Sequence, residues 1–600
     1  MHYMLNDTSD QSLWRRVWPV LVLCTVSLFL FLGLTLFNTR GEPREAVVAV
    51  SMLEQDNWIL PVSNGVDIPY KPPFMHWIIA VLSFFFGGVT EYVSRMPSAL
   101  AATAMTMATY LFFRRHDGRE AGWLTAFVCL TTFEVHRAAM ACRVDMVLTA
   151  CIVMALYALY EWWKRELRGF PWMAVLLMAG AALTKGPVGA LLPGFVFGVF
   201  LLLNPVPAQR KAGWGWHTLA VRTLSVGLRM LGLCLLSLVP LCVWYVLAYR
   251  QPGGGDAFLY LIYEENVLRL TGQMAYDSHV NPWHYNVMTL LAGLTPYTLL
   301  LPLALPLLWR RDGEDATARQ SDGWCGRLSR LSPLLQFVVL SAGLIFLFYC
   351  IPASKRSVYL LPVYPFASYG LAKLMIRMSR RGHKALYAFG CVLSGLMVVL
   401  SGAFVAVRWG WLTPEFLGKT ADAQFIAMWQ ALQSAEVGWR WLLWGLPLVV
   451  SVMFWGRGRR DALPRSVVAL AFCTYMALDG LYQPLVLNVK SDKAEALRIQ
   501  ALQPEGTVYS YRPEDERKDA RNLMHPFTIN YYLNDRVKPL TSLPDGLPRN
   551  GLLITEASDA DSLLARHPDF RLQRLFSKAR SCDGRKPIHV FRFTREDGER

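Results

Sequence analysis

The sequence predicts a polytopic α-helical membrane protein that carries a small α/β domain at its C-terminal end. Of the 600 residues, 54% are hydrophobic and only 17% are charged, whereas a soluble globular chain is about 45–50% apolar and about 25% charged. Apolar stretches long enough to cross a hydrocarbon core of about 30 Å recur along most of the chain. The composition becomes that of a soluble protein only after residue 490.

The first apolar stretch, "WPVLVLCTVSLFLFLGLTLF", predicts an uncleaved membrane anchor. No small-x-small cleavage site follows it, and many more apolar stretches come after it. We therefore count it as the first of about thirteen membrane spans. The expected spans are 19–37, 96–113, 120–134, 144–161, 171–184, 187–203, 229–248, 286–309, 332–350, 357–375, 384–406, 440–456 and 464–482.

The net charge of +16 is distributed as in a membrane protein rather than a nucleic-acid-binding protein. Lys and Arg cluster in short segments between the spans, for example in 114–119, 164–168, 310–330 and 377–384. Such clusters are typical of cytoplasmic loops, and they place the N-terminus on the cytoplasmic side. The opposite, outer face then receives 38–95, 135–143, 185–186, 249–285, 351–356, 407–439 and the C-terminal tail.

Two domains follow from this reading: a transmembrane unit, 1–490, with outer loops 38–95, 249–285 and 407–439, and a soluble outer unit, 491–600. In the second unit "GTVYSYR", "NGLLITEA", "FRLQRLF" and "PIHVFRFT" predict short strands. The segments "HPFTINYYLN" and "DADSLLARH" predict helices. We expect this unit to carry no chemistry, because no ionisable motif stands out in it.

Cysteine spacing and nucleotide motifs add nothing to this reading. The eleven cysteines lie mostly inside spans, with no CxxC or Cys/His metal spacing. There is also no Walker sequence and no GxGxxG. We therefore expect membrane lipid, and not nucleic acid, as a partner.

Ionisable residues instead gather on the expected outer face. Charged groups at span ends are costly unless they are paired or hydrated, and they commonly mark functional sites. Basic residues on this face also oppose the positive-inside rule, and a bound anion is the simplest reason for them. The residues concerned are Glu42, Glu45, Lys71, Arg143, Asp145, Lys185, Arg269, Lys355 and Arg356.

Each of these signals also has a purely structural interpretation. Lys71 precedes Pro72 and Pro73, which favour a helix start where backbone N–H groups attract an anion, yet a lysine there can equally reach the headgroups. Lys185 fits a tight turn between two spans, and the Lys355–Arg356 pair fits a headgroup contact. Asp145 fits a helix N-cap. An N-cap with a salt bridge to Arg44 or Arg40 fits Glu42 and Glu45.

At this point the residues show a family resemblance. The stretch "RGEPREAVVAVSMLEQDNWILPVSNGVDIPYKPPFMHW" resembles the first outer loop of ArnT-like lipid A aminoarabinose transferases, within the protein O-mannosyltransferase-like (GT-C) glycosyltransferases. "RVDM", "LTKGP" and "SKRSVYLLPVYP" are similar to later blocks of that family. The resemblance covers essentially the whole chain. It implies a bacterial inner-membrane protein with a cytoplasmic N-terminus and a periplasmic C-terminal domain.

The resemblance also implies an activity. The family moves a sugar from a polyprenyl-phosphate carrier, here undecaprenyl phosphate, to lipid A or lipopolysaccharide by an inverting displacement. Glu42, Glu45 and Asp145 would supply the catalytic carboxylate. The substrate-binding residues would be Arg44, Tyr70, Lys71, Arg143, Lys185, Arg269, Lys355, Arg356 and Tyr359.

Two residues depart from the family pattern. Gly41 stands where the family usually has the first residue of an Asp-Glu pair, so the essential carboxylate is expected at Glu42 or Glu45. Tyr70 stands where a glutamate often helps to hold a metal. A divalent cation is therefore an open expectation, with Glu42 and Glu45 as its possible ligands.

Two other functions stay open at the level of sequence. The first is a GT-C transferase with another acceptor, such as a protein hydroxyl or a different glycan. The second is a non-catalytic transporter of a lipid-linked sugar, which would be expected to show inverted repeats and polar sites at the membrane midplane. The polar residues gather at one face instead.

Overall fold

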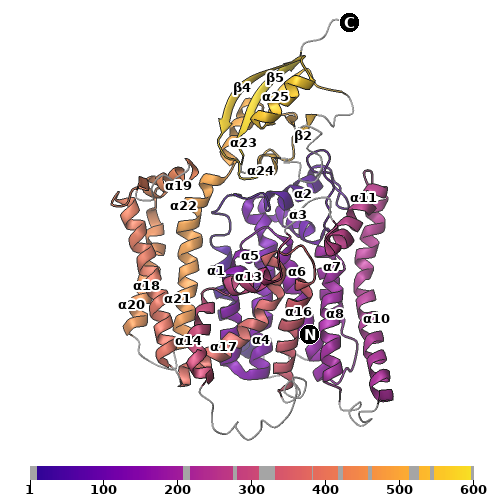
Figure 1. The fold of residues 1–600 in the computed structure, drawn as a ribbon, viewed down its shortest axis with the longest axis vertical. Coiled ribbons are helices and arrows are strands. Elements are labelled where there is room, and N and C mark those ends of the chain that lie inside the picture. Colours follow the sequence, from indigo (N-terminus) through magenta and orange to yellow (C-terminus); the bar gives the residue numbers. More distant parts are fainter. Residues whose placement is uncertain are drawn as a thin grey trace.

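Long helices form a bundle, and a small α/β domain covers one end of it (Figure 1). The structure is a computed structural model that describes residues 10–206, 216–273, 280–309, 331–381, 383–415, 423–456, 463–511, 526–540, 546–584 and 586–595. This architecture confirms the predicted fold class, a polytopic helical membrane protein with a C-terminal α/β domain.

The bundle contains both unbroken and broken helices. Its unbroken helices are α1 (Asp10–Phe29), α6 (Val144–Lys164), α7 (Trp172–Lys185), α8 (Val188–Leu203), α10 (Trp216–Tyr249), α16 (Pro333–Cys350), α17 (Tyr364–Arg381) and α18 (His383–Arg408). α4 (Glu91–Leu130) has a break at Gly118. Its broken ones are α13 (His284–Gly293) with η2 (Tyr297–Leu299) and α14 (Leu300–Trp309), α19 (Ala423–Ser434) with η6 (Gly438–Arg440) and α20 (Trp441–Gly456), and α21 (Leu463–Ala477) with η8 (Leu478–Tyr482), α22 (Gln483–Leu487) and η9 (Asn488–Lys490).

Within the described residues, six helices are long and apolar enough to cross a membrane, and eight if each bent pair counts as one span. α7 and α8 are apolar but shorter. The two spans expected at 96–113 and 120–134 lie in α4, whose backbone breaks at Gly118 with φ of 91°. Thirteen spans therefore remain a prediction.

The first expected span ends earlier than predicted. α1 stops at Phe29, and the chain then turns instead of continuing as helix to residue 37. The side chain of Arg95 accounts for this turn, because it donates hydrogen bonds to the backbone carbonyls of Leu32, at 2.9 Å, and Thr35, at 2.5 Å.

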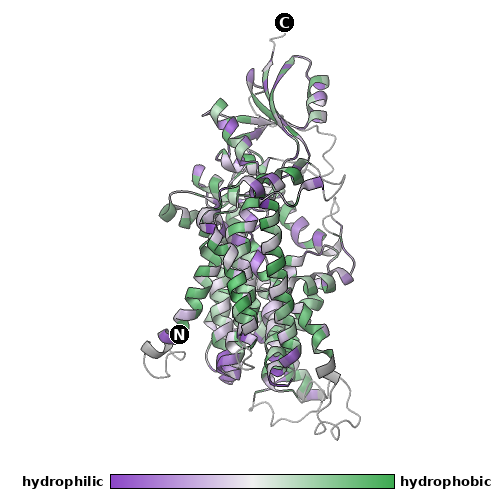
Figure 2. Ribbon diagram, turned by 90° about the vertical axis from the view of Figure 1, so that its left-hand side faces the viewer, coloured by the Kyte–Doolittle hydropathy of each residue, from purple (hydrophilic) through white to green (hydrophobic). Residues whose placement is uncertain are grey.

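α6 lies at the centre of the bundle and α10 at its periphery. In the most apolar 18-residue window of each helix, 89% of the window is buried inside the protein in α6 and only 33% in α10. Apolar side chains cover the outward side of α10, among them Leu228, Leu231 and Leu235. Figure 2 shows hydrophobic residues along the bundle and hydrophilic ones mainly near its ends and in the α/β domain. The bundle therefore presents an apolar surface suited to lipid.

Three of the basic clusters meet at one end of the bundle. Ion pairs join them through Arg115 and Glu161, at 3.4 Å, and through Lys373 and Asp117, at 2.8 Å. α4 runs from Glu91, which contacts the α/β domain, down to this end. The expected cluster at 310–330 lies outside the described residues, as do the basic residues of the sequence at 210–211 and 457–460.

The α/β domain is built on a five-stranded sheet with the order β2-β1-β3-β5-β4. β1 pairs in parallel with β2 and β3, while β5 pairs antiparallel with β3 and β4. Every strand and helix predicted from the sequence is present, and α23 and β2 were not predicted. The elements are α23 (Lys493–Leu502), β1 (Val508–Ser510), α24 (Phe527–Tyr532), β2 (Val537–Pro539), β3 (Asn550–Thr555), α25 (Ala557–Arg566), β4 (Phe570–Lys578) and β5 (Ile588–Arg595). Residue 491 remains our proposed start of this domain.

The domain rests on α2 (Pro43–Glu54) and α3 (Phe74–Phe86), which lie between it and the bundle (Figure 1). Asp535 accepts hydrogen bonds from the Ser51 hydroxyl and the Asn64 amide, both at 2.7 Å. Tyr531 packs on Phe37 with ring centroids 4.8 Å apart. The domain thus holds the outer loop that carries the expected site residues.

The expectation that this domain lacks clustered ionisable residues is wrong. Asp492, Cys582 and Asp583 lie within 4.8 Å of one another. Lys578 pairs with Asp492 at 2.8 Å. The Thr528 amide donates to Asp583, also at 2.8 Å. Chain groups therefore already bind both carboxylates of this cluster.

Candidate functional site

Five segments bring the expected site residues to the end of the bundle that lies under the α/β domain. Arg44 and Glu45 lie in the first turn of α2, and Lys71 precedes the start of α3. Asp145 lies in the first turn of α6, and Lys185 ends α7. The fifth segment, Lys355 and Arg356, directly precedes η4 (Ser357–Val363).

Glu45 is the centre of a buried group of charges. Its carboxylate pairs with the ammonium of Lys71, lies 3.2 Å from Nε2 of His76 and lies 3.6 Å from Arg44. Burial works to raise the pKa of Glu45, but Lys71 and the His76 hydrogen bond outweigh it, so the pKa lies well below its ordinary value. Burial likewise works to lower the pKa of Lys71, and Glu45 raises it above the ordinary value. Both groups are therefore charged at neutral pH.

Tyr70 provides an aromatic face for two of these cations. The Arg44 guanidinium and the Lys71 ammonium lie 5.4 and 5.3 Å from the centre of its ring. Such cation–π contacts stabilise the two cations in addition to their ion pairs with Glu45.

Asp145 and Lys185 form a second ion pair of this site. Oδ1 of Asp145 and Nζ of Lys185 are 2.5 Å apart, and Lys185 lies 4.2 Å from the ring centre of Tyr359. The alternative role of Asp145 as an N-cap is wrong, because α6 begins after Arg143 and has no side-chain cap. Lys71 interacts electrostatically with Asp145, so the two ion pairs belong to one cluster.

Glu42 has a different environment from Glu45. Arg95 binds its two oxygens at 2.8 and 3.0 Å, and the Cys142 amide donates to it at 2.9 Å. Glu42 therefore pairs with Arg95, which was not among its expected partners, while the expected partner Arg44 pairs with Glu45. Burial works to raise the pKa of Glu42, but Arg95 and the Cys142 hydrogen bond lower it below its ordinary value. Because Arg95 and the Cys142 amide bind both of its oxygens, Glu42 is suited to fixing the first outer loop against these two residues.

Gly41 makes room for Arg143. A Cβ added at Gly41 would overlap Nη2 of Arg143 and lie 2.9 Å from its Cζ. The guanidinium of Arg143 therefore covers the glycine, and it interacts electrostatically with Glu42 and Asp145 on either side.

The remaining expected cations differ in their contacts. Arg269 pairs with Glu265 one helical turn earlier, at 2.6 Å. Lys355 is buried, and its ammonium donates to the carbonyl of Pro352 at 2.7 Å. In the described part of the chain the guanidinium of Arg356 has no ion pair, and its Nε has no hydrogen-bond partner. The guanidinium of Arg356 is therefore available to bind an anion, whereas the ammonium of Lys355 is already hydrogen-bonded within its own loop.

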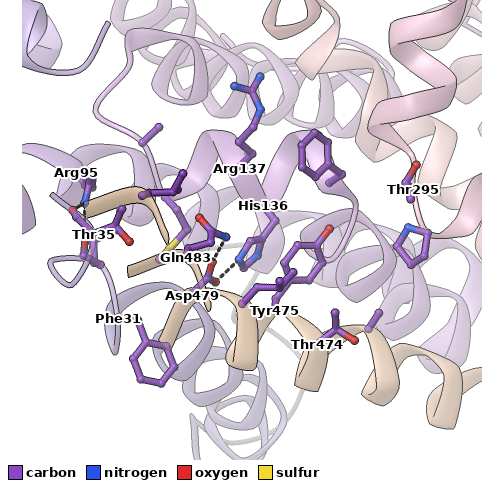
Figure 3. A pocket seen from close by; sticks show the side chains of 18 of the residues that line it. Phe31, Thr35, Arg95, His136, Arg137, Thr295, Thr474, Tyr475, Asp479 and Gln483 are labelled. Atoms are coloured by element: carbon purple, nitrogen blue, oxygen red, sulfur yellow. Dashed lines mark hydrogen bonds and ion pairs between the residues drawn. The ribbon is translucent and has the colours of Figure 1, made fainter. Parts of the chain in front are cut away.

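A cavity of about 580 Å³ adjoins this cluster on the side of Glu42 and Arg143. Its polar wall also holds His136 and Asp479, whose Nε2 and Oδ2 are 2.6 Å apart, and Gln483 (Figure 3). Its apolar wall comes from α18 and α21 and includes Phe389, Leu393, Leu396, Met397 and Ala471.

His136 and Asp479 were missed in the sequence. Asp479 lies in a π-helical turn, η8, between the apolar helices α21 and α22. A carboxylate inside an expected span is the signal that could have identified it. Tyr475 stacks on the His136 ring at 4.0 Å, and both rings line the cavity.

The residues do not fit a metal at Glu42 and Glu45. Each carboxylate is already bound by chain cations, Glu42 by Arg95 and Glu45 by Lys71 and Arg44. Among the described residues, the only group of three or more possible metal ligands within reach of one another is the one in the α/β domain, and its carboxylates are engaged. We therefore assign no step to a metal.

Comparisons with known proteins agree with this geometry. The family model described as "Dolichyl-phosphate-mannose-protein mannosyltransferase" matches residues 70–229. An uncharacterized protein of Aquifex aeolicus is 28% identical over 58% of this chain and 61% of its own length. An undecaprenyl phosphate-alpha-4-amino-4-deoxy-L-arabinose arabinosyl transferase of Shewanella sediminis is 26% identical over 55% of this chain and 54% of its own. The chain thus spans little more than half the length of these curated relatives.

The fold matches over a longer range. The crystal structure of ArnT from Cupriavidus metallidurans bound to undecaprenyl phosphate aligns with a TM-score of 0.63, at 19% identity, over 98% of each chain. The apo structure of the same protein aligns with a TM-score of 0.62.

The chain therefore has the fold of a GT-C type membrane protein. Its sequence is similar to those of arabinosyl transferases and its fold to that of ArnT, so the resemblance predicted from the sequence is confirmed.

Proposed function

We propose that the chain is an inverting membrane glycosyltransferase that moves a sugar from an undecaprenyl-phosphate carrier to lipid A or lipopolysaccharide. The observation that carries this proposal is a set of partly buried cations at the end of an ArnT-like bundle: Lys71 and Lys185, held by Glu45 and Asp145, and Arg356, which directly precedes the turn whose Tyr359 ring lies against Lys185. Phosphate is the leaving group, and fixed cations stabilise the charge that develops on it.

The proposed reaction is a direct displacement. An ionised phosphate oxygen of lipid A attacks the anomeric carbon of the sugar as the bond from that carbon to the carrier phosphate breaks, so no proton has to be removed. The electron pair of the broken bond stays on the phosphate, next to Lys71 and Arg356. Glu45 holds Lys71 in place, and Asp145 holds Lys185.

The acceptor is tested most simply in cells. Mass spectrometry of lipid A from cells with and without the gene should show one glycosyl increment that depends on the gene. The family model's description names a protein acceptor, so glycopeptides of the same cells are compared. An unchanged lipid A profile together with a lost glycopeptide would replace lipid A by a protein hydroxyl.

We also propose that the α/β domain is periplasmic and the basic end of the bundle cytoplasmic. Reporter fusions at Gly506, in the domain, and at Gly118, at the break of α4, should report opposite sides of the membrane. Reports from the same side would contradict this topology.

A further inference from the structure

Arg137, in the short helix α5 (Phe133–Ala139), presents an open edge of its guanidinium to the cavity. Glu134 binds its Nε and Nη2, at 3.2 and 2.6 Å, and Nη2 also lies 3.4 Å from the Ser357 hydroxyl. Within the described residues, Nη1 has no hydrogen-bond partner. The side chain is 41% exposed and extends away from the His136–Asp479 pair (Figure 3). Because an arginine carries five N–H donors, this one can bind a second anion while Glu134 holds it in place.

Arg143 is a second open guanidinium of the same cavity wall. In the part of the chain that the structure describes, its side chain forms no ion pair and no hydrogen bond, and it interacts with Glu42 and Asp145 only electrostatically. Arg95, which also lines the cavity, instead uses all three guanidinium nitrogens on Glu42 and on two backbone carbonyls. Arg137 and Arg143 are therefore the arginines of this wall that retain donors for a ligand.

The two carboxylates of the cavity wall are already bound by the chain. Arg95 binds both oxygens of Glu42, at 2.8 and 3.0 Å. One oxygen of Asp479 lies 2.6 Å from Nε2 of His136, and the other accepts a hydrogen bond from Gln483 at 2.9 Å. The negative charge of each carboxylate is offset by its partners, so an anion at the open guanidinium groups is repelled less than it would be by free carboxylates.

The cavity lies beside the proposed carrier site without containing it. Arg356, which we assign to the carrier phosphate, is not among the described residues that line the cavity. Ser357, which Arg137 contacts, directly follows Arg356 in the chain. On the apolar wall, Leu299 and Leu396 are exposed, so alkyl chains can pack against them. A molecule that combines a phosphate with alkyl chains therefore fits this cavity.

We propose that Arg137 and Arg143 bind a phosphate of the acceptor lipid in this cavity, with Glu134 as the positioning residue of Arg137. This inference rests on the proposed function, because the phosphate oxygen that attacks the sugar needs a binding site separate from that of the carrier phosphate. The acceptor then belongs to the class of phosphorylated lipids. A protein hydroxyl carries no charge for these guanidinium groups to bind.

The test measures acceptor binding to the purified full-length protein by native mass spectrometry, with undecaprenyl phosphate present to occupy the carrier site. The two probes are lipid A and the same lipid A without its phosphates. We expect the wild type to bind lipid A at least tenfold more tightly than the phosphate-free form. Arg137→Gln should weaken binding of lipid A about tenfold and change that of the phosphate-free form, and of undecaprenyl phosphate, less than about twofold.

Further variants separate anion binding from folding. Arg137→Gln leaves the buried carboxylate of Glu134 unpaired, so the double variant Glu134→Gln/Arg137→Gln is measured in parallel and should show the same loss. Arg143→Gln should also weaken binding of lipid A but not of its phosphate-free form. Arg168→Gln is the matched control, because it too breaks an ion pair with a nearby glutamate, Glu166 at 3.0 Å, and should bind as the wild type does.

Lipid A binding that Arg137→Gln and the double variant leave unchanged would overturn the inference, as would an equal loss for the phosphate-free form. Transfer rates distinguish this failure from that of the proposed function. A wild type that transfers sugar to lipid A, with an acceptor KM that Arg137→Gln does not raise, would contradict the inference alone. A wild type that neither binds lipid A nor transfers sugar to it would contradict both.

Discussion

At the scale of single residues, the site is made of cations held by carboxylates that differ in their roles. Glu45 and Asp145 orient Lys71 and Lys185, whereas Glu42 fixes the loop through Arg95. Sequence patterns predicted that most of these residues lie on one face of the membrane. They did not predict which of the residues form ion pairs with one another. Glu45 and Lys71 are 26 residues apart, and only the packing of α2 against α3 joins them.

Lys71 is expected to contribute most directly to phosphate stabilisation. Lys71→Ala should lower turnover about ten- to a hundredfold, because one charge-assisted contact to phosphate is worth about 1.5–3 kcal/mol. Lys71→Arg should restore only part of it, since a planar fork differs from a point charge. Initial transfer rates of the purified variants measure this. Full activity in Lys71→Ala would leave Lys71 with a structural role only, as the ion-pair partner of Glu45.

The adjacent Lys355 and Arg356 should behave differently, although the sequence suggested one cationic pair. Arg356→Ala should weaken binding of undecaprenyl phosphate about tenfold or more, because its guanidinium is free to bind the phosphate. Lys355→Ala should leave the affinity nearly unchanged and lower the thermal stability, because its ammonium is bonded to Pro352. Equal losses of affinity in both variants would contradict this division.

At the scale of elements, helix α2 connects the α/β domain to the ionic cluster around Glu45. Its first turn carries Arg44 and Glu45, and Ser51, two turns further on, donates to Asp535 of the domain. Periodicity and turn residues predicted most strands and helices of the domain. They did not predict α23. They also did not predict β2, because a three-residue strand is defined by its neighbours in the sheet more than by its own sequence.

Loss of this contact should disturb α2 without unfolding the domain. Asp535→Ala removes the acceptor of the Ser51 and Asn64 hydrogen bonds. We expect faster amide hydrogen exchange in residues 43–54 and severalfold slower transfer. Asp569→Ala is the control, because it breaks an ion pair with Arg595 at the far side of the sheet. Equal exchange rates in the two variants would rule out a positioning role for the domain.

At the scale of the whole molecule, composition was sufficient to predict a helical membrane protein with a C-terminal α/β domain. Hydropathy cannot place a short or bent span, so α7, α8 and the two bent helix pairs leave the number of spans open. The buried cluster around Asp583 was not predictable either, because its members are some 90 residues apart in sequence.

Asp583 should make stability depend on pH. Burial, together with the neighbouring Asp492, raises the pKa of Asp583 from an ordinary value of 3.8 to about 7. Between these two values the folded chain binds more protons at this group than the unfolded chain, so the group's contribution to stability falls as the pH rises from about 4 to 7. Lys578 and Arg40 are the nearby cations that oppose this effect.

Asp583→Asn should remove this dependence. Its melting temperature should exceed that of the wild type by about 2 °C or more at pH 8 and differ little at pH 5. Tryptophan fluorescence during heating measures the transition. The exposed Asp561→Asn serves as the control and should follow the wild type at both pH values. A constant offset between Asp583→Asn and the wild type would show that Asp583 does not titrate in this range.

The most direct measurement is sugar transfer by the purified protein in nanodiscs, with a radiolabelled sugar on undecaprenyl phosphate and lipid A as the acceptor. The wild type should move the label to lipid A and release undecaprenyl phosphate in equal amount, and Lys71→Ala should lose most of this activity. No transfer by the folded wild type to lipid A, or a rate that Lys71→Ala leaves unchanged, would contradict a lipid-to-lipid glycosyltransferase that acts through this cluster.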